Sequence, residues 1–163
     1  MQSSMPFGTT CRRKLGNAAL RRGRQSIPGQ RYLLTFTTFK RQPFFSDHGL
    51  AMQAAKEIHD GRSWTKSSLL AWVLMPDHWH GLVELGDAET LSQLMRGFKA
   101  NLSRRLRPGQ PGMGPIWASS FHDHALRHEE DSMKVARYIV MNPVRAGLVR
   151  RVGDYPFWNA VWV

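Results

Sequence analysis

The chain has 163 residues, a formal net charge of +11 and one cysteine, Cys11, so one domain with a sizeable core is expected, and an intrachain disulfide or a cysteine-based zinc finger is excluded. No apolar stretch is long enough to span a membrane and no signal peptide is visible, so we expect a soluble, cytoplasmic protein. The positive charge favours a polyanionic partner, with nucleic acid ahead of an anionic membrane surface.

Residues 1–29 read as a basic arm that is partly disordered on its own, because apolar periodicity is weak there. The alternative is a solvated tail, but the overall charge favours an arm that binds nucleic acid. We expect a main domain at 30–155 and an aromatic tail at 156–163 that packs back on it. The arm contains no acidic residue, and its basic residues are Arg12, Arg13, Lys14, Arg21, Arg22 and Arg24.

The first half of the main domain predicts a strand, a helix and a hairpin. Residues 31–39 are rich in β-formers and predict the first strand. Asp47 is a predicted N-cap for a helix that runs to about Asp60. Two apolar stretches, 67–75 and 78–85, are separated by only two residues and therefore predict an antiparallel hairpin.

The second half predicts a helix, a strand and a last helix. Thr90 and Gln93 form a capping box ahead of an apolar stripe at helical spacing. A strand is predicted at 117–126, and a helix at 129–142 with acidic residues in its first turn. The helix that follows Thr90 carries basic residues, and no acidic residue occurs between positions 90 and 120. These basic side chains could simply form a solvated face, but we expect phosphate contacts from Arg96, Lys99, Arg104 and Arg105.

The order β-α-β-β-α-β followed by a helix predicts an α+β protein with a ferredoxin-like split βαβ sandwich. In that fold an antiparallel sheet is covered by two helices on one face. The other face is then left to bear histidines, and an added C-terminal helix carries a tyrosine.

His78 and His80 open the predicted strand at 78–85, on either side of Trp79. Because side chains alternate along a strand, the two imidazoles share one face, about 7 Å apart along the backbone. They can bind one cation and leave coordination positions open for a substrate; the alternative is a polar strand end that binds nothing. His122 and His124 repeat this spacing, but there packing or a hydrogen bond to a backbone carbonyl is the preferred interpretation.

Asp131, Lys134, Tyr138 and Asn142 share one face of the last predicted helix. Alone, Tyr138 is most simply a surface tyrosine that forms a hydrogen bond. With a metal-binding histidine pair, however, a chemical role becomes coherent. A phenol, with a pKa near 10, attacks poorly unless a cation stabilises its anion. A divalent metal on a scissile phosphate would neutralise charge there, so that the tyrosine could form a phosphotyrosyl bond.

Two segments resemble one known family. Residues 75–80, Met-Pro-Asp-His-Trp-His, resemble the His-hydrophobic-His motif of the single-tyrosine HUH transposases. Residues 138–149 are similar to the tyrosine helix of their REP-associated branch, the RAYT proteins. Two further segments also fit that branch: Arg31-Tyr32-x-x-Thr35 and Phe121-His122-Asp123-His124-Ala125-Leu126-Arg127.

The resemblance covers about residues 30–155. It implies a single-stranded DNA endonuclease and strand transferase that acts on REP-type hairpins with a single-stranded flank, through a 5′-phosphotyrosine. Tyr138 is then the nucleophile, His78 and His80 hold Mg²⁺ or Mn²⁺, and Asn142 matches the position of a third ligand. Ligand chemistry alone favours Mn²⁺ or Zn²⁺ over Mg²⁺. The expected protein is cytoplasmic and nucleoid-associated, a monomer or a homodimer, with Lys134 among its DNA contacts.

The sequence departs from the family at Asp77, where Asn is common, and at Trp79, which is bulkier than the usual Val or Ile. Neither position is a proposed ligand. Two other functions stay open. One is a non-catalytic nucleic-acid-binding regulator with the same fold, against which the intact His78, His80 and Tyr138 argue. The other is a metal-dependent hydrolase that uses water, which would need a general base, and no carboxylate pair near the histidines is evident.

Overall fold

A computed structural model describes residues 25–109, 112–127 and 131–162 of the chain. Its centre is a five-stranded antiparallel sheet in the order β4-β1-β3-β2-β5. The strands are β1 (Arg31–Thr37), β2 (Ser68–Met75), β3 (His78–Glu84), β4 (His122–Ala125) and β5 (Trp158–Ala160). The α-helices are α2 (His48–His59), α3 (Leu91–Leu106), α4 (Ser132–Val140) and α5 (Asn142–Arg145). The order of the first four strands confirms the predicted ferredoxin-like topology.

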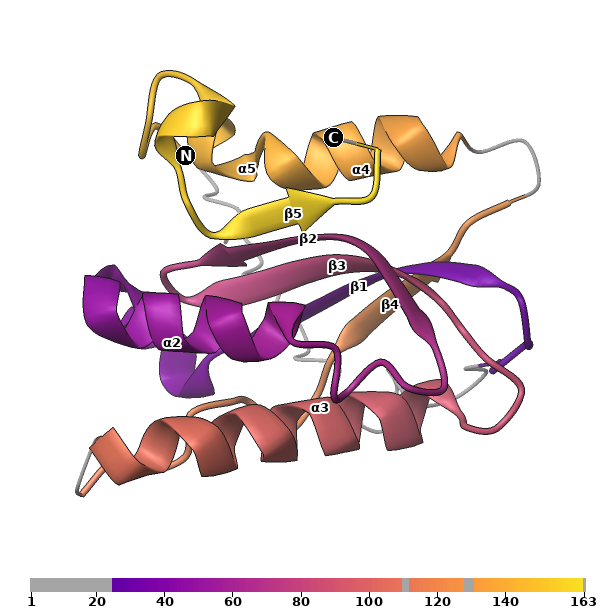
Figure 1. Ribbon diagram of the computed structural model, residues 1–163, viewed down its shortest axis with the longest axis horizontal. Coiled ribbons are helices and arrows are strands. Elements are labelled where there is room, and N and C mark those ends of the chain that lie inside the picture. The colour runs from indigo at the N-terminus through magenta and orange to yellow at the C-terminus, as the bar shows by residue number, and fades with distance from the viewer. Residues whose placement is uncertain (1–24, 110–111, 128–130, 163) are drawn as a thin grey trace, which may run out of the picture.

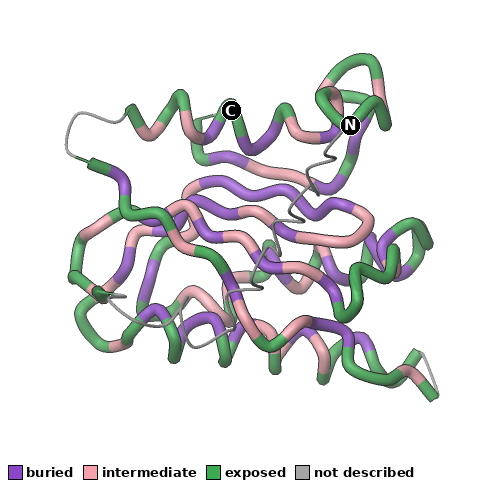
Figure 2. The backbone as a smooth tube through the Cα atoms, turned by 180° about the vertical axis from the view of Figure 1, so that it is seen from behind, coloured by how far each residue is buried: buried purple, intermediate pink, exposed green. Residues whose placement is uncertain are grey.

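The helices lie on both faces of the sheet, with α2 and α3 on one side and α4 and α5 on the other (Figure 1). The central strands β2 and β3 are largely buried, whereas α3 and α4 are exposed along the side that faces away from the sheet (Figure 2). No helix within the described residues combines the length and the apolar composition needed to cross a membrane.

The predicted helix starts are confirmed by their caps. The Asp47 side chain accepts a hydrogen bond from the Leu50 backbone N–H at 2.7 Å, which satisfies an amide that the first turn of α2 leaves open. At α3 the Thr90 hydroxyl accepts from the Gln93 backbone N–H, and the Gln93 side chain accepts from the Thr90 N–H. The predicted apolar stripe of α3 is buried in full: Leu91, Leu94, Met95, Phe98, Leu102 and Leu106.

Strand β4 is shorter than the stretch 117–126 that the sequence predicts. Lys99 on α3 explains the difference, because its Nζ donates to the carbonyl oxygens of Ala118 and Ser120 at 2.9 and 2.7 Å. Those carbonyls therefore point to the helix instead of a neighbouring strand. Only a single bridge between Trp117 and Thr38 remains of the first half of the predicted strand.

The last helix also differs from its predicted bounds of 129–142. Asp131 is the N-cap, since its carboxylate accepts from the Met133 N–H at 2.8 Å, and no acidic residue occupies the first turn. Helix α4 ends at Val140, and the one-turn helix α5 starts at Asn142 with Pro143 as its second residue. Proline lacks an N–H and suits a helix start, which is why the chain begins a new turn there.

The predicted aromatic tail does pack on the body, and three of its residues extend the sheet as β5, which the sequence did not predict. Trp158 pairs with Val73 and Ala160 with Ala71 of β2. The predicted arm lies mostly outside the described residues. Its last part is described, and there the Leu91 N–H donates to the Ser26 hydroxyl, so residues 25–29 are tied to the start of α3.

Candidate active site

The two histidines of β3 point away from the aromatic core. Trp79 is fully buried and packs on Phe36 and on Phe98 of α3, with ring centroids 5.0 and 5.1 Å apart. Because neighbouring side chains on a strand point in opposite directions, His78 and His80 face the side of α4. Their ring centroids are 4.8 Å apart and both side chains are partly exposed, so the predicted pair on one face is confirmed.

His80 is held by the neighbouring strand. Its Nδ1 lies 2.7 Å from the Thr35 hydroxyl oxygen of β1, the residue directly across the ladder. In the tautomer that carries the proton on Nδ1, Nε2 keeps a lone pair for a cation. Burial, followed by the positive charges of His78, Arg145 and Arg41, lowers the pKa of His80 from 6.5 to about 4, so the ring is neutral at physiological pH.

His78 is held by a carboxylate. Its Nδ1 donates to Asp77 Oδ1 at 2.5 Å, and Asp77 Oδ2 accepts from Arg41 Nη1 at 3.0 Å. Burial raises the pKa of the Asp77 carboxyl, but the hydrogen bonds from His78 and Arg41 outweigh it and leave the pKa below its usual value. A carboxylate on the Nδ1 side of an imidazole fixes the ring and strengthens Nε2 as a ligand.

The loop that delivers Arg41 is held in a left-handed backbone conformation, with φ of 53° at Lys40 and 56° at Arg41. Residues with a Cβ adopt this region at a cost. The surrounding bonds keep the loop in place. The Phe39 N–H donates to Ile116 O, and the single hydrogen of the buried Thr38 hydroxyl is shared between Gln42 O at 2.7 Å and Asp77 O at 3.0 Å. The Thr38 backbone N–H also donates to Asp77 O, which fixes the turn before His78.

The donor set of the histidine pair fits a divalent metal. The Nδ1 atoms are both hydrogen-bonded, to Asp77 and Thr35, which leaves both Nε2 atoms for a shared cation. Within the described residues no group of three or more His, Cys, Asp or Glu side chains is arranged to hold a metal ion. A metal here would therefore keep positions for substrate oxygens. The predicted third ligand, Asn142, stays a prediction.

Tyr138 lies on α4, which packs against β2, β3 and β5 on the histidine side of the sheet. Its side chain is 49% exposed. The other two tyrosines are buried and their hydroxyls are used by the fold. Tyr32 donates to Gln25 O and accepts from the Ile27 N–H, and Tyr155 donates to Leu74 O at 2.7 Å. Burial raises the pKa of Tyr155 to about 12.

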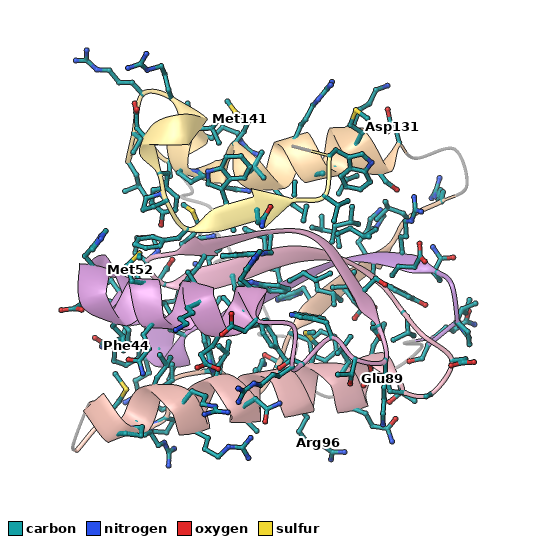
Figure 3. The ribbon with its side chains drawn as sticks, in the orientation of Figure 1. Phe44, Met52, Glu89, Arg96, Asp131 and Met141 are labelled. Atoms are coloured by element: carbon teal, nitrogen blue, oxygen red, sulfur yellow. The ribbon has the colours of Figure 1, made fainter. Side chains whose placement is uncertain are left out.

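The end of the tyrosine helix is closed by side chains. The Asn142 amide donates to the carbonyl oxygens of Tyr138 and Ile139 at 3.1 and 2.9 Å. The Arg145 guanidinium lies over the Tyr138 ring, with its Cζ 4.0 Å from the ring centroid. Asp131 and Met141 mark the two ends of this helix in Figure 3.

Sequence reasoning missed four residues that shape the site: Thr35, Arg41, Asp77 as a histidine partner, and Arg145. Only Thr35 had a signal, because it ends the Arg31-Tyr32-x-x-Thr35 segment, and the ladder between β1 and β3 then sets it opposite His80 on the same face. Arg41 is positioned by the geometry of its loop, and Arg145 by the junction between α4 and α5. No spacing in the sequence indicates either position.

His122 and His124 lie on β4, outside the histidine pair. The ladder sets His122 opposite Thr35 and His124 opposite Leu33, so both occupy the face that carries His80, one strand farther out. Both side chains are exposed, so neither has the packed role that the sequence offered, and a hydrogen bond to a backbone carbonyl stays a prediction.

The predicted phosphate contacts have different environments. Arg96 is exposed and points outward from α3 (Figure 3), and Lys134 is exposed on α4. Lys99 is committed to two backbone carbonyls. Arg105 pairs with Glu57 at 3.6 Å, and Arg104 donates to the Asn101 side chain. The arm residues Arg12, Arg13, Lys14, Arg21, Arg22 and Arg24 lie outside the described residues.

A groove of about 460 Å³ runs between α3 and residues 115–121. Its wall carries Arg96 and Arg107 together with serine side chains and Lys99. Cations and hydroxyl groups are the usual protein partners of phosphate oxygens, so the lining of this groove is compatible with an anionic ligand.

Comparison with known proteins gives three findings. A family model described as "Transposase IS200 like" matches residues 26–142. The REP-associated tyrosine transposase of Escherichia coli K12 is 33% identical over 88 residues, which are 53% of this chain and 50% of that protein, so the chain spans about half the length of the curated relatives it matches. A solved structure of a REP-associated tyrosine transposase bound to a REP hairpin superimposes with a TM-score of 0.65 and 27% identity, over 83% of this chain and 79% of that one.

Proposed function

Since the chain belongs to the family of IS200-like transposases, which confirms the family predicted from its motifs, we propose that it cleaves and rejoins single-stranded DNA through Tyr138. The proposed substrate is a REP-type DNA hairpin with a single-stranded flank. A related protein whose structure is described as bound to a REP hairpin supports this substrate, and so does the net charge of +11.

One observation carries the proposal: the exposed tyrosine and the histidine pair lie on the same side of the sheet, while the two other tyrosines are buried and hydrogen-bonded. A nucleophile must reach the phosphate, and only Tyr138 among the three exposes its ring. Helix α4, which carries Tyr138, packs against β2 and β3 on the face of the sheet that bears His78 and His80.

In the proposed reaction the Tyr138 hydroxyl oxygen forms a bond to the scissile phosphorus and the bond from phosphorus to the 3′ oxygen breaks. The phenol proton passes to solvent, and the departing oxygen takes up a proton to become a 3′-hydroxyl. The product is a 5′-phosphotyrosine, in which the phosphodiester energy is kept for rejoining. The reverse attack by a 3′-hydroxyl restores the strand and releases the tyrosine.

His78 and His80 would hold a divalent metal, Mg²⁺ or Mn²⁺, with Asn142 as the proposed third ligand through its amide oxygen. When bound, such an ion supplies neutralisation of charge on the phosphate. Asp77 and Thr35 orient the two rings, and the neutral state of His80 leaves it able to donate its lone pair.

DNA contacts away from the reacting phosphate are proposed for the exposed Arg96, Arg104 and Lys134, for Arg105 beside its Glu57 partner, and for the arm from Arg12 to Arg24. These charges would supply most of the affinity, since phosphate contacts position a nucleic acid without reading its sequence. Lys99 is proposed to act indirectly, by shaping the wall of the groove beside α3.

The test is a denaturing gel of an end-labelled hairpin with a single-stranded flank, incubated with Mn²⁺ or Mg²⁺. Wild-type protein should yield a covalent protein–DNA band, and Tyr138→Phe should abolish it. The matched control is Tyr155→Phe, which removes a hydroxyl from a buried ring and should keep the band despite a loss of about 1 kcal/mol in stability. Hairpin binding should survive in both variants.

The other outcomes separate the competing functions. Cleavage without a covalent band in the wild type would indicate a metal-dependent hydrolase that uses water. Hairpin binding with neither cleavage nor a band would indicate the non-catalytic regulator. A band that persists in Tyr138→Phe would mean that another residue is the nucleophile.

A further inference from the structure

Among the described residues, Arg145 is the cation that contacts Tyr138, the proposed nucleophile. Its Cζ lies 4.0 Å from the centroid of the Tyr138 ring, and its Nη1 lies 3.5 Å from the Tyr138 carbonyl oxygen. Arg145 follows Tyr138 by seven residues, about two helical turns, so the joint between α4 and α5 keeps the two side chains on one side. The guanidinium lies over one face of the ring, and the Tyr138 side chain is still 49% exposed.

The backbone under Arg145 is well anchored. The Asn142 amide ties the last turn of α4 to the start of α5, and Pro143 is buried. The Arg145 N–H donates to Met141 O at 3.0 Å, and Gly147, with φ of +71°, turns the chain away after one helical turn. Helix α5 also contacts β2, the partner strand of the histidine strand. Arg145 is therefore presented by a fixed turn on the side of the sheet that bears the histidine pair.

The charge of Arg145 also acts beyond the ring. It is one of the positive charges that lower the pKa of His80, so its field reaches the histidine pair as well as Tyr138. No carboxylate of the described residues lies within salt-bridge distance of its guanidinium. An arginine that is stacked on an aromatic ring and not paired with an acid retains N–H donors for an anion.

We propose that Arg145 is a catalytic residue that binds a non-bridging oxygen of the scissile phosphate while it stacks on Tyr138. This assignment rests on the proposed function of Tyr138 as the nucleophile. The planar guanidinium can form two parallel hydrogen bonds to a phosphate, and it keeps all its protons throughout. A fixed cation beside the attacking oxygen stabilises the negative charge that develops on the phosphate in the transition state.

The first part of the test measures single-turnover rates of covalent adduct formation on the flanked hairpin. Arg145→Gln should lower the rate about 100-fold or more, as expected when one preorganised donor is lost from a transition state. Arg145→Lys keeps the charge but not the fork and should give an intermediate rate. Arg137→Gln, which removes an exposed arginine next to Tyr138, is the matched control and should react like wild type.

The second part measures binding without chemistry, in a Tyr138→Phe background. One hairpin carries the ordinary scissile phosphodiester, and the other carries a methylphosphonate there, which has no negative charge. Neutralising this phosphate should weaken binding when Arg145 is present and change it much less in Arg145→Gln. Thermal unfolding of each variant shows whether it is folded. Because the Arg145 side chain is exposed, we expect every Arg145 variant to be folded.

The outcomes separate this inference from the proposed function. If wild type forms no adduct, Tyr138 is not a nucleophile and both proposals fail. If wild type forms an adduct and folded Arg145→Gln forms it at the same rate, only the assignment of Arg145 fails. A methylphosphonate effect of equal size with and without Arg145 would also overturn it, because the guanidinium would then not contact that phosphate.

Discussion

Neighbouring residues of β3 enter two different environments. Trp79 packs among aromatic rings on the side of α2 and α3, with no exposed surface. His78 and His80 lie on the side of α4 with hydrogen bonds to Asp77 and Thr35, and both remain partly exposed. The alternation of a strand therefore separates the residues that stabilise the fold from those proposed for chemistry by a single position. Substitutions on one face should cost stability, and substitutions on the other should cost activity.

The indole ring of Trp79 needs room above its own strand. A Cβ at Gly81 would lie 2.0 Å from Cη2 of the Trp79 indole, so only glycine allows that ring to lie over the strand. The larger residue at position 79 and the glycine two positions on are thus one packing unit. Neither touches the opposite face, which explains why a bulky tryptophan is compatible with the histidine motif.

The largest expected effects come from substituting the histidine face and the tryptophan face of β3 in separate proteins. The double substitution His78→Ala, His80→Ala should lower metal-dependent adduct formation by about 1,000-fold or more while the fold and hairpin affinity persist. Trp79→Ala should instead cost about 3–5 kcal/mol of unfolding free energy, the usual range for a buried tryptophan. Denaturant unfolding and adduct gels of both proteins make the check. Undiminished cleavage by the double variant would remove the metal assignment.

A smaller effect is expected from the partner of His78. Asp77→Asn replaces a carboxylate by a neutral amide and should weaken Mn²⁺ binding about 10- to 100-fold, since such partners orient and strengthen imidazole ligands. Calorimetric titration of the folded protein with Mn²⁺ measures this directly. Asp47→Asn is the matched control, because asparagine is an equally good helix cap there and is far from the histidines in sequence. Equal affinity in Asp77→Asn and wild type would show that the carboxylate does not act on the ligand.

The smallest effect links the histidine face to stability through pH. Burial lowers the pKa of His80 to about 4 in the folded chain, from an ordinary value of 6.5. Between pH 6.5 and pH 4, therefore, His80 is protonated in the unfolded chain and neutral in the folded chain. Stability contributed by neutral His80 is present above pH 6.5 and is lost as the pH falls toward 4. Between pH 7 and pH 4.5 the loss should be about 2 kcal/mol.

Urea unfolding of wild type and His80→Gln at the two pH values checks this sign. The variant should show the smaller loss, because glutamine does not titrate. His59→Gln, on the exposed side of α2, should behave like wild type. A wild type and His80→Gln pair with parallel pH dependence would mean that the folded chain does not resist protonation at position 80.

The elements that the sequence predicted well are those with local signals. Thr90, Gln93 and the apolar stripe of α3 lie within one stretch, so capping and periodicity defined the start of that helix and its buried face. The two-residue turn before His78 fixed the hairpin in the same way. The face shared by His78 and His80 also followed from spacing alone, because strand geometry has a period of two.

The features that could not be predicted depend on contacts between distant segments. Lys99 shortens β4 by binding carbonyls about twenty residues away, which no local pattern encodes. Arg41 reaches Asp77 only because two left-handed residues turn its loop. Arg145 meets Tyr138 through a helix joint at Asn142 and Pro143, where the sequence indicated only a helix end. Strand β5 was missed because three residues carry too little alternation.

The sheet ends in two very short strands, β4 with four residues and β5 with three. An edge strand offers unpaired N–H and C=O groups to any other extended chain, and long flat edges invite aggregation. Here each edge can offer only a few such groups, so strand addition by another copy gains little. Crowded copies of the protein would therefore meet through side chains, which a charge of +11 keeps apart at low salt.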